Sequence, residues 1–486
     1  MQAPKDGKPK CLFSIICPPI KHIWRDFSDD SLHLARTLSY FAPMARFQVK
    51  HCCLFFLIFL PFLGRGQTDT VKWFPAPPLY YSFVDYDENV ITHVNKLDTA
   101  FFKKLAKVRV QHKGRVNIVH IGDSHLQADM LTAVLRNGFQ EYFGNLGRGL
   151  IFPYQLANTN APRDFTTSSN TTWKSNRIGV NKPVKTGVCG FGIHSAKDNA
   201  TIRVHLKDVD ERMQCFNRMV FFLGEDSTCY KLSDSNLSET VVLHSRNGSD
   251  TPSLVYECDS MLCGFELTKS DTRETGDFSC YGMSLEIKDT CGVLYHTIGV
   301  NGARFDQYLQ NDLFWRQLKA LNGDLFIVSL GTNEAQNPTI NESKLLNICD
   351  SFVRKIRRAS PKAAILFTTP AGSYFKAKKP NPTVQTVSRI ITQYCAYHEI
   401  PCWDLNKITD GANGAVQFKK YNLLSRDLVH YTQLGYEMQG LLLLNAFADA
   451  YNKYYKSHPI INKPAAPSSK PKVVIKYIEK GKDPHN

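Results

Sequence analysis

The sequence lacks any run of about 18 consecutive apolar residues, so a protein that crosses a membrane several times is excluded. It has no internal repeats, and its 29 glycines and 24 prolines are an ordinary share of 486 residues. Together with an aromatic content of 12%, these counts exclude disordered, collagen-like and low-complexity proteins. A chain of this length can form two or three domains and bury a substantial core.

Acidic residues are outnumbered by basic ones, 44 to 59, which gives a formal net charge of +15. A basic chain could bind nucleic acid or anionic lipid. However, residues 1–66 hold nine Lys and Arg against four Asp and Glu, and residues 457–486 hold six against two. The remaining charge of +6 is spread over residues 67–456, so we expect no nucleic-acid partner.

The amino end has the features of an export signal. A short basic stretch precedes 12 apolar residues at 52–63, and the small residues Gly64 and Gly66 follow. This arrangement is typical of a secretory signal peptide. We therefore predict that residues 1–66 are a presequence, with Met44 as a possible start, and that the protein reaches the periplasm or cell envelope. An uncleaved anchor is the alternative, and this segment is the only expected membrane contact.

The cysteines are unevenly distributed. Of the 14 cysteines, four lie within residues 1–66 and seven lie from Cys189 to Cys291. In an oxidising compartment such a cluster suggests disulfide bonds, whose pairing the sequence does not reveal. Buried free thiols are the alternative. A zinc site is disfavoured because Cys258 and Cys263 have no second close pair of Cys or His nearby.

Much of the chain alternates strand and helix patterns, which predicts an α/β fold with a parallel sheet covered by helices on both faces. We assign this pattern to one domain in two segments, 67–163 and 291–456. Short apolar runs predict strands at 116–121, 325–330, 363–368 and 401–405. Apolar residues at helical spacing predict helices at 126–143, 304–321, 341–358, 384–398 and 433–455.

Residues 164–290 have a different pattern. Short strand-like runs at 200–206, 219–223 and 239–244 are separated by Gly, Asn, Asp and Ser. Few helical periods occur, so we predict an all-β insert, a sandwich, that interrupts the α/β domain. Residues 457–486 are expected to form a flexible basic tail.

The motif GDSH at 122–125 follows the first predicted strand, where the next helix begins. Ligands of open α/β sheets bind beyond the carboxyl ends of the strands, so we expect Ser124 to be exposed there. Backbone N–H groups at the start of a helix can stabilise an oxyanion. The alternative is a simple Ser or Asp helix cap.

Two further polar motifs lie later in the chain. Asn333 stands in GTNE after the strand at 325–330, where its amide can turn toward Ser124. The alternative is a turn that needs only Gly and Asn. Asp427 and His430 lie three residues apart ahead of the last helix. An Asp at this spacing can fix the His tautomer so that His acts as a general base, although such pairs also occur as ordinary surface contacts.

Together and in this order, the motifs resemble those of the SGNH (GDSL-like) hydrolase superfamily. The resemblance implies a flavodoxin-like parallel sheet between helices, with Ser124 as nucleophile, His430 as general base and Asp427 as its orienting acid. It also implies an oxyanion hole formed by Ser124, Gly302 and Asn333. We choose Gly302 for this role because it directly precedes a predicted helix.

A closer resemblance is to exported peptidoglycan O-acetylesterases. GDSH is followed by LQAD, GRGLIFPY, VNGA, SLGTNEA and DLVHYTQLGY. Those enzymes insert a jelly-roll domain that resembles a carbohydrate-binding module, and the β region at 164–290 begins at the same relative place. The resemblance implies an O-acetylated glycan as partner, loss of acetyl from the 6-hydroxyl of N-acetylmuramic acid, and no cofactor or metal. His125 replaces the Leu of GDSL, and GTNE replaces GxND, but neither change touches a catalytic atom.

The loop at 371–382 follows a predicted strand and is expected to overhang the active face. Tyr374 could stack on a sugar ring, and Lys376 could meet a carboxylate. A plain solvated loop is the alternative for both. His120, on the first strand, is expected to be an ordinary core histidine.

Two other functions stay open at this point. One is a lysophospholipase or another lipid or acyl esterase of the same superfamily, although the residues after the Ser motif are rich in Gly, Asn and Pro and favour sugar. The other is a non-catalytic envelope protein that binds glycan through the β insert. The presence of Ser124, Asp427 and His430 argues against the latter. The sequence also leaves open an acetyltransferase, in which a glycan replaces water as the acetyl acceptor. It does not indicate the oligomeric state.

Overall fold

The computed structural model describes residues 72–460, apart from 210–214, 225–228, 235–236, 238–239, 245–253 and 271–277. The predicted presequence at 1–66 lies outside the described residues, as does the predicted tail at 457–486 from residue 461 onward. Among the helices that the structure describes, none combines the length and the apolar character needed to cross a membrane.

A six-stranded sheet forms the centre of the α/β part, in the order β1-β19-β16-β15-β2-β14. The strands from β19 to β14 run parallel, and the short β1 pairs antiparallel with β19. The predicted α/β fold is confirmed, and all four predicted strands are present, with β14 as an additional edge strand. The strands are β1 (Ile91–Thr92), β2 (Arg115–Gly122), β14 (Gly292–Gly299), β15 (Leu325–Ser329), β16 (Ala364–Thr368) and β19 (Cys402–Trp403).

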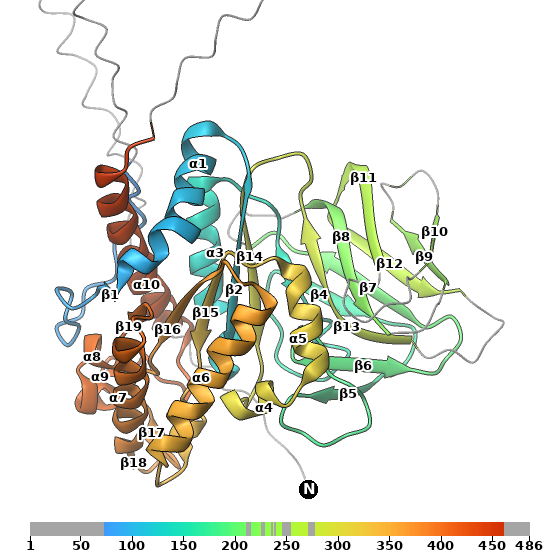
Figure 1. Ribbon diagram of the computed structural model, residues 1–486. Coiled ribbons are helices and arrows are strands. Elements are labelled where there is room, and N and C mark those ends of the chain that lie inside the picture. The colour runs from blue at the N-terminus through green and yellow to red at the C-terminus, as the bar shows by residue number, and fades with distance from the viewer. Residues whose placement is uncertain are drawn as a thin grey trace, which may run out of the picture. The chain divides into compact units, whose positions relative to one another are not determined.

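Helices cover both faces of this sheet. Alternate residues of a strand point to opposite faces, so each apolar strand packs against helices on both sides. Val119 and Ile121 of β2 pack with α4, α5, α6 and α7, whereas Val116 and Ile118 pack with α1, α3 and α10. In Figure 1, α6 lies in front of the sheet and α3 lies behind it. The helices are α1 (Lys103–Gln111), α3 (Met130–Phe143), α4 (Phe305–Leu309), α5 (Asp312–Leu318), α6 (Glu342–Ala359), α7 (Pro382–Tyr397) and α10 (Gln433–Ser457).

Two of the predicted helices are interrupted. The helix expected at 126–143 divides into α2 (Ser124–Gln127) and α3, because Asp129 adopts a left-handed backbone conformation with a φ of 60°. The helix expected at 304–321 divides into α4, α5 and a 3-10 turn, and the Asn311 side chain caps α5. The other three predicted helices are confirmed as α6, α7 and α10.

The break at Asp129 is stabilised by a buried ion-pair network. Arg136 and Arg148 donate to the Asp129 carboxylate at 2.8 Å and 2.7 Å. Arg148 also pairs with Asp164, and the Thr297 hydroxyl of β14 donates to Asp129 at 3.1 Å. A buried charge is stable only when it is paired and hydrogen-bonded, so these contacts hold α3, β14 and the residues before β4 together.

Two antiparallel sheets lie between β2 and β14 in the chain, in the orders β10-β9-β12-β7-β4 and β11-β8-β13-β6-β5. Phe216 and Phe221 of one sheet pack edge to face on Phe265 of the other, so the sheets stack as in a sandwich. In Figure 1 they lie to one side of the parallel sheet. They are consistent with an insert, whereas the boundaries 67–163, 164–290 and 291–456 stay predictions.

The strands of these sheets include the three runs predicted from the sequence, which correspond to β7, β8 and β10. β3 joins the second sheet by pairing with β13. The strands are β3 (Gly149–Ile151), β4 (Phe165–Ser168), β5 (Lys174–Arg177), β6 (Phe191–Ser195), β7 (Thr201–Leu206), β8 (Phe216–Leu223), β9 (Cys229–Ser233), β10 (Val241–His244), β11 (Leu254–Leu262), β12 (Gly264–Lys269) and β13 (Phe278–Glu286).

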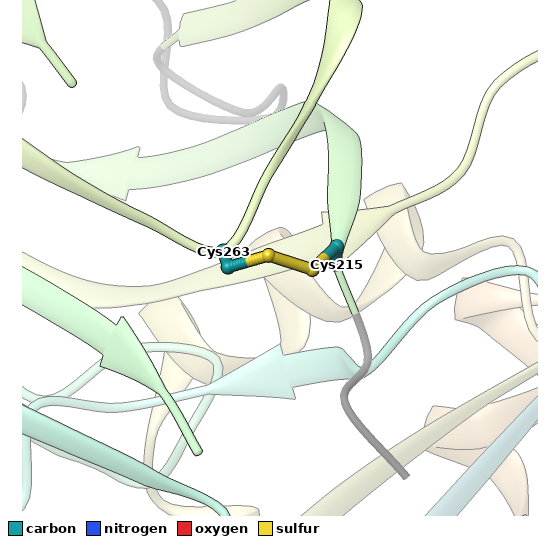
Figure 2. Close-up of a disulfide and its surroundings, with 2 residues drawn as sticks. All are labelled: Cys215 and Cys263. Atoms are coloured by element: carbon teal, nitrogen blue, oxygen red, sulfur yellow. A yellow bond between two sulfur atoms is a disulfide. The ribbon is translucent and has the colours of Figure 1, made fainter. Parts of the chain in front are cut away.

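One disulfide bond lies in the antiparallel region. Cys215, directly before β8, is bonded to Cys263, between β11 and β12, with a Cα–Cα distance of 4.5 Å (Figure 2). Other cysteines of the described part are buried as free thiols, so both interpretations of the cysteine cluster apply, each to part of it. The buried free thiols are Cys189, Cys280, Cys349, Cys395 and Cys402.

Candidate active site

Ser124 lies at the carboxyl end of β2, where the strand turns sharply into α2. Gly122 ends the strand, and a Cβ atom there would lie 2.6 Å from the Ser329 carbonyl oxygen, so the turn requires glycine. The Asp123 carboxylate caps α2 by accepting a hydrogen bond from the His125 N–H at 3.0 Å. These residues hold Ser124 at the edge of the sheet where ligands of α/β proteins bind.

His430 and Asp427 reach Ser124 from the loop that precedes α10. His430 Nε2 lies 2.8 Å from Ser124 Oγ, and His430 Nδ1 lies 2.6 Å from Asp427 Oδ2. The loop is tightly turned, because Leu428 has a φ of 59° and the Ser425 N–H donates to the His430 carbonyl oxygen. The structure thus brings the three predicted triad side chains into one continuous chain of hydrogen bonds.

The Asp427 carboxylate is held in its ionised form. Partial burial raises its pKa, but hydrogen bonds from the His430 ring, the Val429 and His430 N–H groups and the Ser425 hydroxyl together hold the pKa well below its usual value. An ionised Asp427 accepts a hydrogen bond from His430 Nδ1–H. The hydrogen therefore stays on Nδ1, and the lone pair of Nε2 faces the Ser124 hydroxyl. A general base requires this tautomer. The side chains of His430 and Asp427 are 39% and 53% exposed, so solutes can reach them.

A buried polar layer lies behind this chain. The ring centroid of His125 lies 5.3 Å from that of His430, and His125 Nδ1 lies 3.0 Å from the Tyr436 hydroxyl. Burial, together with nearby His430, lowers the pKa of His125 to about 3, so the imidazole is neutral. Burial raises the pKa of Asp123 to about 7. His125 and Asp123 line an internal cavity of about 40 Å³, which has room for about two water molecules.

The two other predicted oxyanion-hole residues follow the strands on either side of β2. Gly302 lies after β14 in a turn with a φ of 74°. Asn333 lies after β15, and its amide donates to the Ala303 carbonyl oxygen at 2.9 Å and, more weakly, to Asp123 at 3.4 Å. Because parallel strands share one carboxyl edge, Gly302 and Asn333 lie at the same edge of the sheet as Ser124.

The structure corrects the role expected for Tyr374. Its ring is only 7% exposed and packs in the apolar cluster of α1, α3 and α10, with Lys419 Nζ 5.2 Å above it. A buried ring has no free face for stacking on a sugar. Tyr374 begins the hairpin of β17 (Tyr374–Phe375) and β18 (Lys379–Pro380), and its N–H donates to the Leu428 carbonyl oxygen at 2.8 Å. Lys376 is exposed at the hairpin turn, and a substrate contact there stays a prediction.

Three residues close to the triad were absent from the predicted site. Ser425 donates to Asp427 at 2.7 Å, and His125 and Tyr436 form the layer behind His430. His125 gave a signal in the sequence, because it stands where the GDSL pattern has Leu. Tyr436 ends the motif DLVHYTQLGY, but nothing in the motif indicated its contact with His125, and an isolated Ser such as Ser425 is common.

Residues 259–438 match the model of the GDSL-like lipase/acylhydrolase family. The matched segment contains Gly302, Asn333, Asp427 and His430, whereas Ser124 lies before it. This segment of the chain is therefore similar to GDSL-like acylhydrolases. The similarity fits a hydrogen-bonded Ser, His and Asp at the carboxyl edge of the sheet.

A solved structure has the same fold as this chain. A structure of a peptidoglycan O-acetylesterase matches with a TM-score of 0.64 and 19% identity, over 75% of this chain and 99% of that chain. The predicted SGNH hydrolase fold is thereby confirmed. A lipase/acylhydrolase from Enterococcus faecalis matches 32% of this chain and 77% of its own at 17% identity, with a TM-score of 0.25. Among curated proteins, no significant match was found.

Proposed function

We propose that the protein is an exported serine esterase that removes O-acetyl groups from peptidoglycan, at the 6-hydroxyl of N-acetylmuramic acid. The observation that carries the proposal is the hydrogen-bonded chain from Ser124 Oγ through His430 to Asp427. Such a chain activates a serine hydroxyl for attack on an ester carbonyl.

In the first half of the reaction, Ser124 Oγ attacks the acetyl carbonyl carbon while its proton passes to His430 Nε2. The carbonyl oxygen becomes an oxyanion, which the N–H groups of Ser124 and Gly302 and the Asn333 amide stabilise. Each such donor is worth roughly 3 kcal/mol in the transition state. The His430 imidazolium, stabilised by Asp427, then gives its proton to the sugar oxygen, and the ester bond breaks to leave an acetyl group on Ser124.

In the second half, His430 takes a proton from water, and the resulting hydroxide attacks the acetyl group on Ser124. The tetrahedral intermediate collapses, Ser124 Oγ regains its proton from His430, and acetate leaves. Every proton moves between Ser124, His430, water and the glycan, so the chain's own residues supply all of the acid and base chemistry.

Three observations support a glycan substrate outside the cytoplasm. A peptidoglycan O-acetylesterase shares the fold over almost its whole length. The two antiparallel sheets provide additional surface beside the hydrolase sheet. The basic and apolar pattern at 1–66 and the Cys215–Cys263 disulfide both suit an exported protein.

The proposal is tested by measuring acetate release from O-acetylated peptidoglycan, with Ser124→Ala as the matched control. We expect release by the wild type and none above background by the variant. A wild type that is inactive on this glycan but cleaves lysophospholipid would instead assign the site to a lipid esterase. A protein that binds the glycan and hydrolyses no ester would be the non-catalytic alternative.

A further inference from the structure

A second cavity, of about 300 Å³, lies at the opposite end of the parallel sheet from Ser124. It is lined by Arg115 and Asn117 near the start of β2, whereas Ser124 follows the end of that strand. At about 3.3 Å per residue, the length of β2 separates the two sites by roughly 23 Å. The other walls come from β14, from β8 and β13 of the antiparallel region, and from the 3-10 turn at Lys319–Leu321. This cavity is therefore distinct from the candidate active site.

Basic side chains dominate its charge. Glu286 of β13 accepts hydrogen bonds from Arg115 at 2.6 Å and Arg218 at 2.5 Å, and the Ser284 hydroxyl donates to it at 2.8 Å. The carboxylate thus fixes both guanidinium groups against the cavity wall. A guanidinium has five N–H donors, so both arginines keep donors for a ligand. Arg218 also donates to Glu257 at 2.8 Å. With Lys319 as a third positive charge, the cavity keeps an excess of one positive charge over Glu286 and Glu257.

Neutral polar groups of the same wall have no partner in the described part of the chain. Asn117 Nδ2 donates to two backbone carbonyl oxygens, which fixes the amide orientation, while Asn117 Oδ1 is buried and accepts no hydrogen bond. His296 is 1% exposed, and neither of its ring nitrogens has a partner. Burial lowers the pKa of His296 to about 4, so the ring offers one donor and one acceptor. Buried polar groups nearly always have a hydrogen-bond partner, so a ligand or a water molecule is expected to bind these atoms.

We propose that this cavity binds one carboxylated sugar unit, with its carboxylate toward Arg115, Arg218 and Lys319 and its hydroxyl or acetamido groups toward Asn117 and His296. A simple inorganic anion would match the basic groups but would leave the amide and imidazole unsatisfied. A neutral sugar would match those two but would leave the positive charge uncompensated. The volume suits a monosaccharide and falls at the lower end of the range for small-molecule sites. The proposal stands independently of the esterase activity.

The test titrates the full-length protein with glucuronic acid and N-acetylmuramic acid, using ligand-observed NMR. Glucose and N-acetylglucosamine serve as matched neutral sugars, and inorganic phosphate serves as a simple anion. We expect both acidic sugars to bind at least about tenfold more tightly than their neutral counterparts, which lack the charge-assisted hydrogen bonds of the carboxylate. We expect the same margin over phosphate, which leaves the Asn117 amide and the His296 imidazole without partners. Equal affinity for acidic and neutral sugars, equal affinity for phosphate, or no binding would overturn the proposal.

Variants locate the binding. Lys319→Glu reverses an exposed charge at the cavity, and Lys362→Glu makes the same change at an exposed position outside its lining. We expect Lys319→Glu to weaken acidic-sugar binding at least about tenfold and Lys362→Glu to leave it unchanged, with hydrolysis of a small soluble ester equal in both. Ser124→Trp, which fills the candidate active site, should also leave binding unchanged. Binding that survives Lys319→Glu and disappears in Ser124→Trp would place the sugar at the active site and contradict the proposal.

Discussion

Ser124 Oγ lies 2.8 Å from His430 Nε2, although the two residues are 306 positions apart in the chain. The contact forms because β2 and the loop before α10 both end at the carboxyl edge of the sheet. The antiparallel sheets occupy part of the intervening sequence without disturbing this edge. The triad geometry therefore depends on the parallel sheet and on the 425–430 loop.

Replacement of Asp427 by Asn tests the tautomer argument. The new side-chain amide would donate to His430 Nδ1 instead of accepting from it, so Nε2 would carry the hydrogen and could not deprotonate Ser124. We predict that Asp427→Asn lowers kcat on a small acetyl ester by about 10³- to 10⁴-fold. The melting temperature should change little because the Asn Oδ1 can still accept the hydrogen bonds from Ser425, Val429 and His430 that Asp427 Oδ1 accepts.

The matched control for Asp427→Asn is Asp289→Asn, at an exposed left-handed position that Asn accepts readily. It should retain the wild-type kcat. Activity of Asp427→Asn within tenfold of the wild type would contradict a general-base role for His430.

The buried network around Asp129 should be far more sensitive to mutation than a surface ion pair. Arg148→Ala leaves Asp129 and Asp164 short of a buried partner, and we predict a loss of about 3–5 kcal/mol in the free energy of unfolding. Arg389→Ala, which breaks the exposed pair with Glu342, should cause a much smaller loss. Urea unfolding of both variants measures the difference, and equal losses would show that the network contributes no more than a surface pair.

Glu334 gives a prediction about pH and stability. Burial raises its pKa from 4.5 to about 7, while one carboxylate oxygen accepts the Phe305 N–H. Between these values Glu334 keeps a proton in the folded protein that it has lost in the unfolded chain, so the contribution of Glu334 to the free energy of unfolding falls as pH rises from about 4.5 to 7.

Glu334→Gln keeps the oxygen that accepts the Phe305 N–H and cannot ionise. Relative to the wild type, the free energy of unfolding of this variant should increase by on the order of 3 kcal/mol as pH rises from about 4.5 to 7. Above pH 7 the difference should stay constant. The buried Asp123 titrates in both proteins, and its charge contributes to the raised pKa of Glu334. Urea unfolding from pH 4.5 to 8 provides the measurement, and a pH-independent difference would refute the titration of Glu334.

Removal of the disulfide should affect stability and spare catalysis. Cys215 and Cys263 are 48 residues apart, so their bond restricts the unfolded chain by about 3–4 kcal/mol. We predict that Cys215→Ser lowers the free energy of unfolding by that amount and leaves kcat on a small ester within twofold. Cys291→Ser, at a free and partly exposed thiol, is the control and should match the wild type. A large loss of kcat in Cys215→Ser alone would show that the antiparallel region shapes the active site.

The sequence was most informative where local pattern alone determines structure. The apolar runs of β2, β15 and β16 and the motifs around Ser124 and His430 could be recognised because each is a short contiguous signal. β14 was not singled out, since it directly follows the antiparallel region and its residues resemble another strand of it.

Long-range contacts explain what the sequence could not show. The helix break at Asp129 depends on Arg148 and Asp164, which lie elsewhere in the chain. Tyr374 likewise has a partner far along the chain, a backbone hydrogen bond to Leu428, and it is buried although residues 376–379 of the same loop are exposed. His125 stood out only as a departure from a motif, and its contact with Tyr436 required the folded chain.

Ser124 as the nucleophile is tested most directly by mass spectrometry of the Ser124 peptide after rapid acid quenching of a reaction with O-acetylated peptidoglycan. We predict an acetyl group on Ser124 in the wild type, and neither this modification nor acetate release in Ser124→Ala. Undiminished acetate release by Ser124→Ala would contradict this role of Ser124.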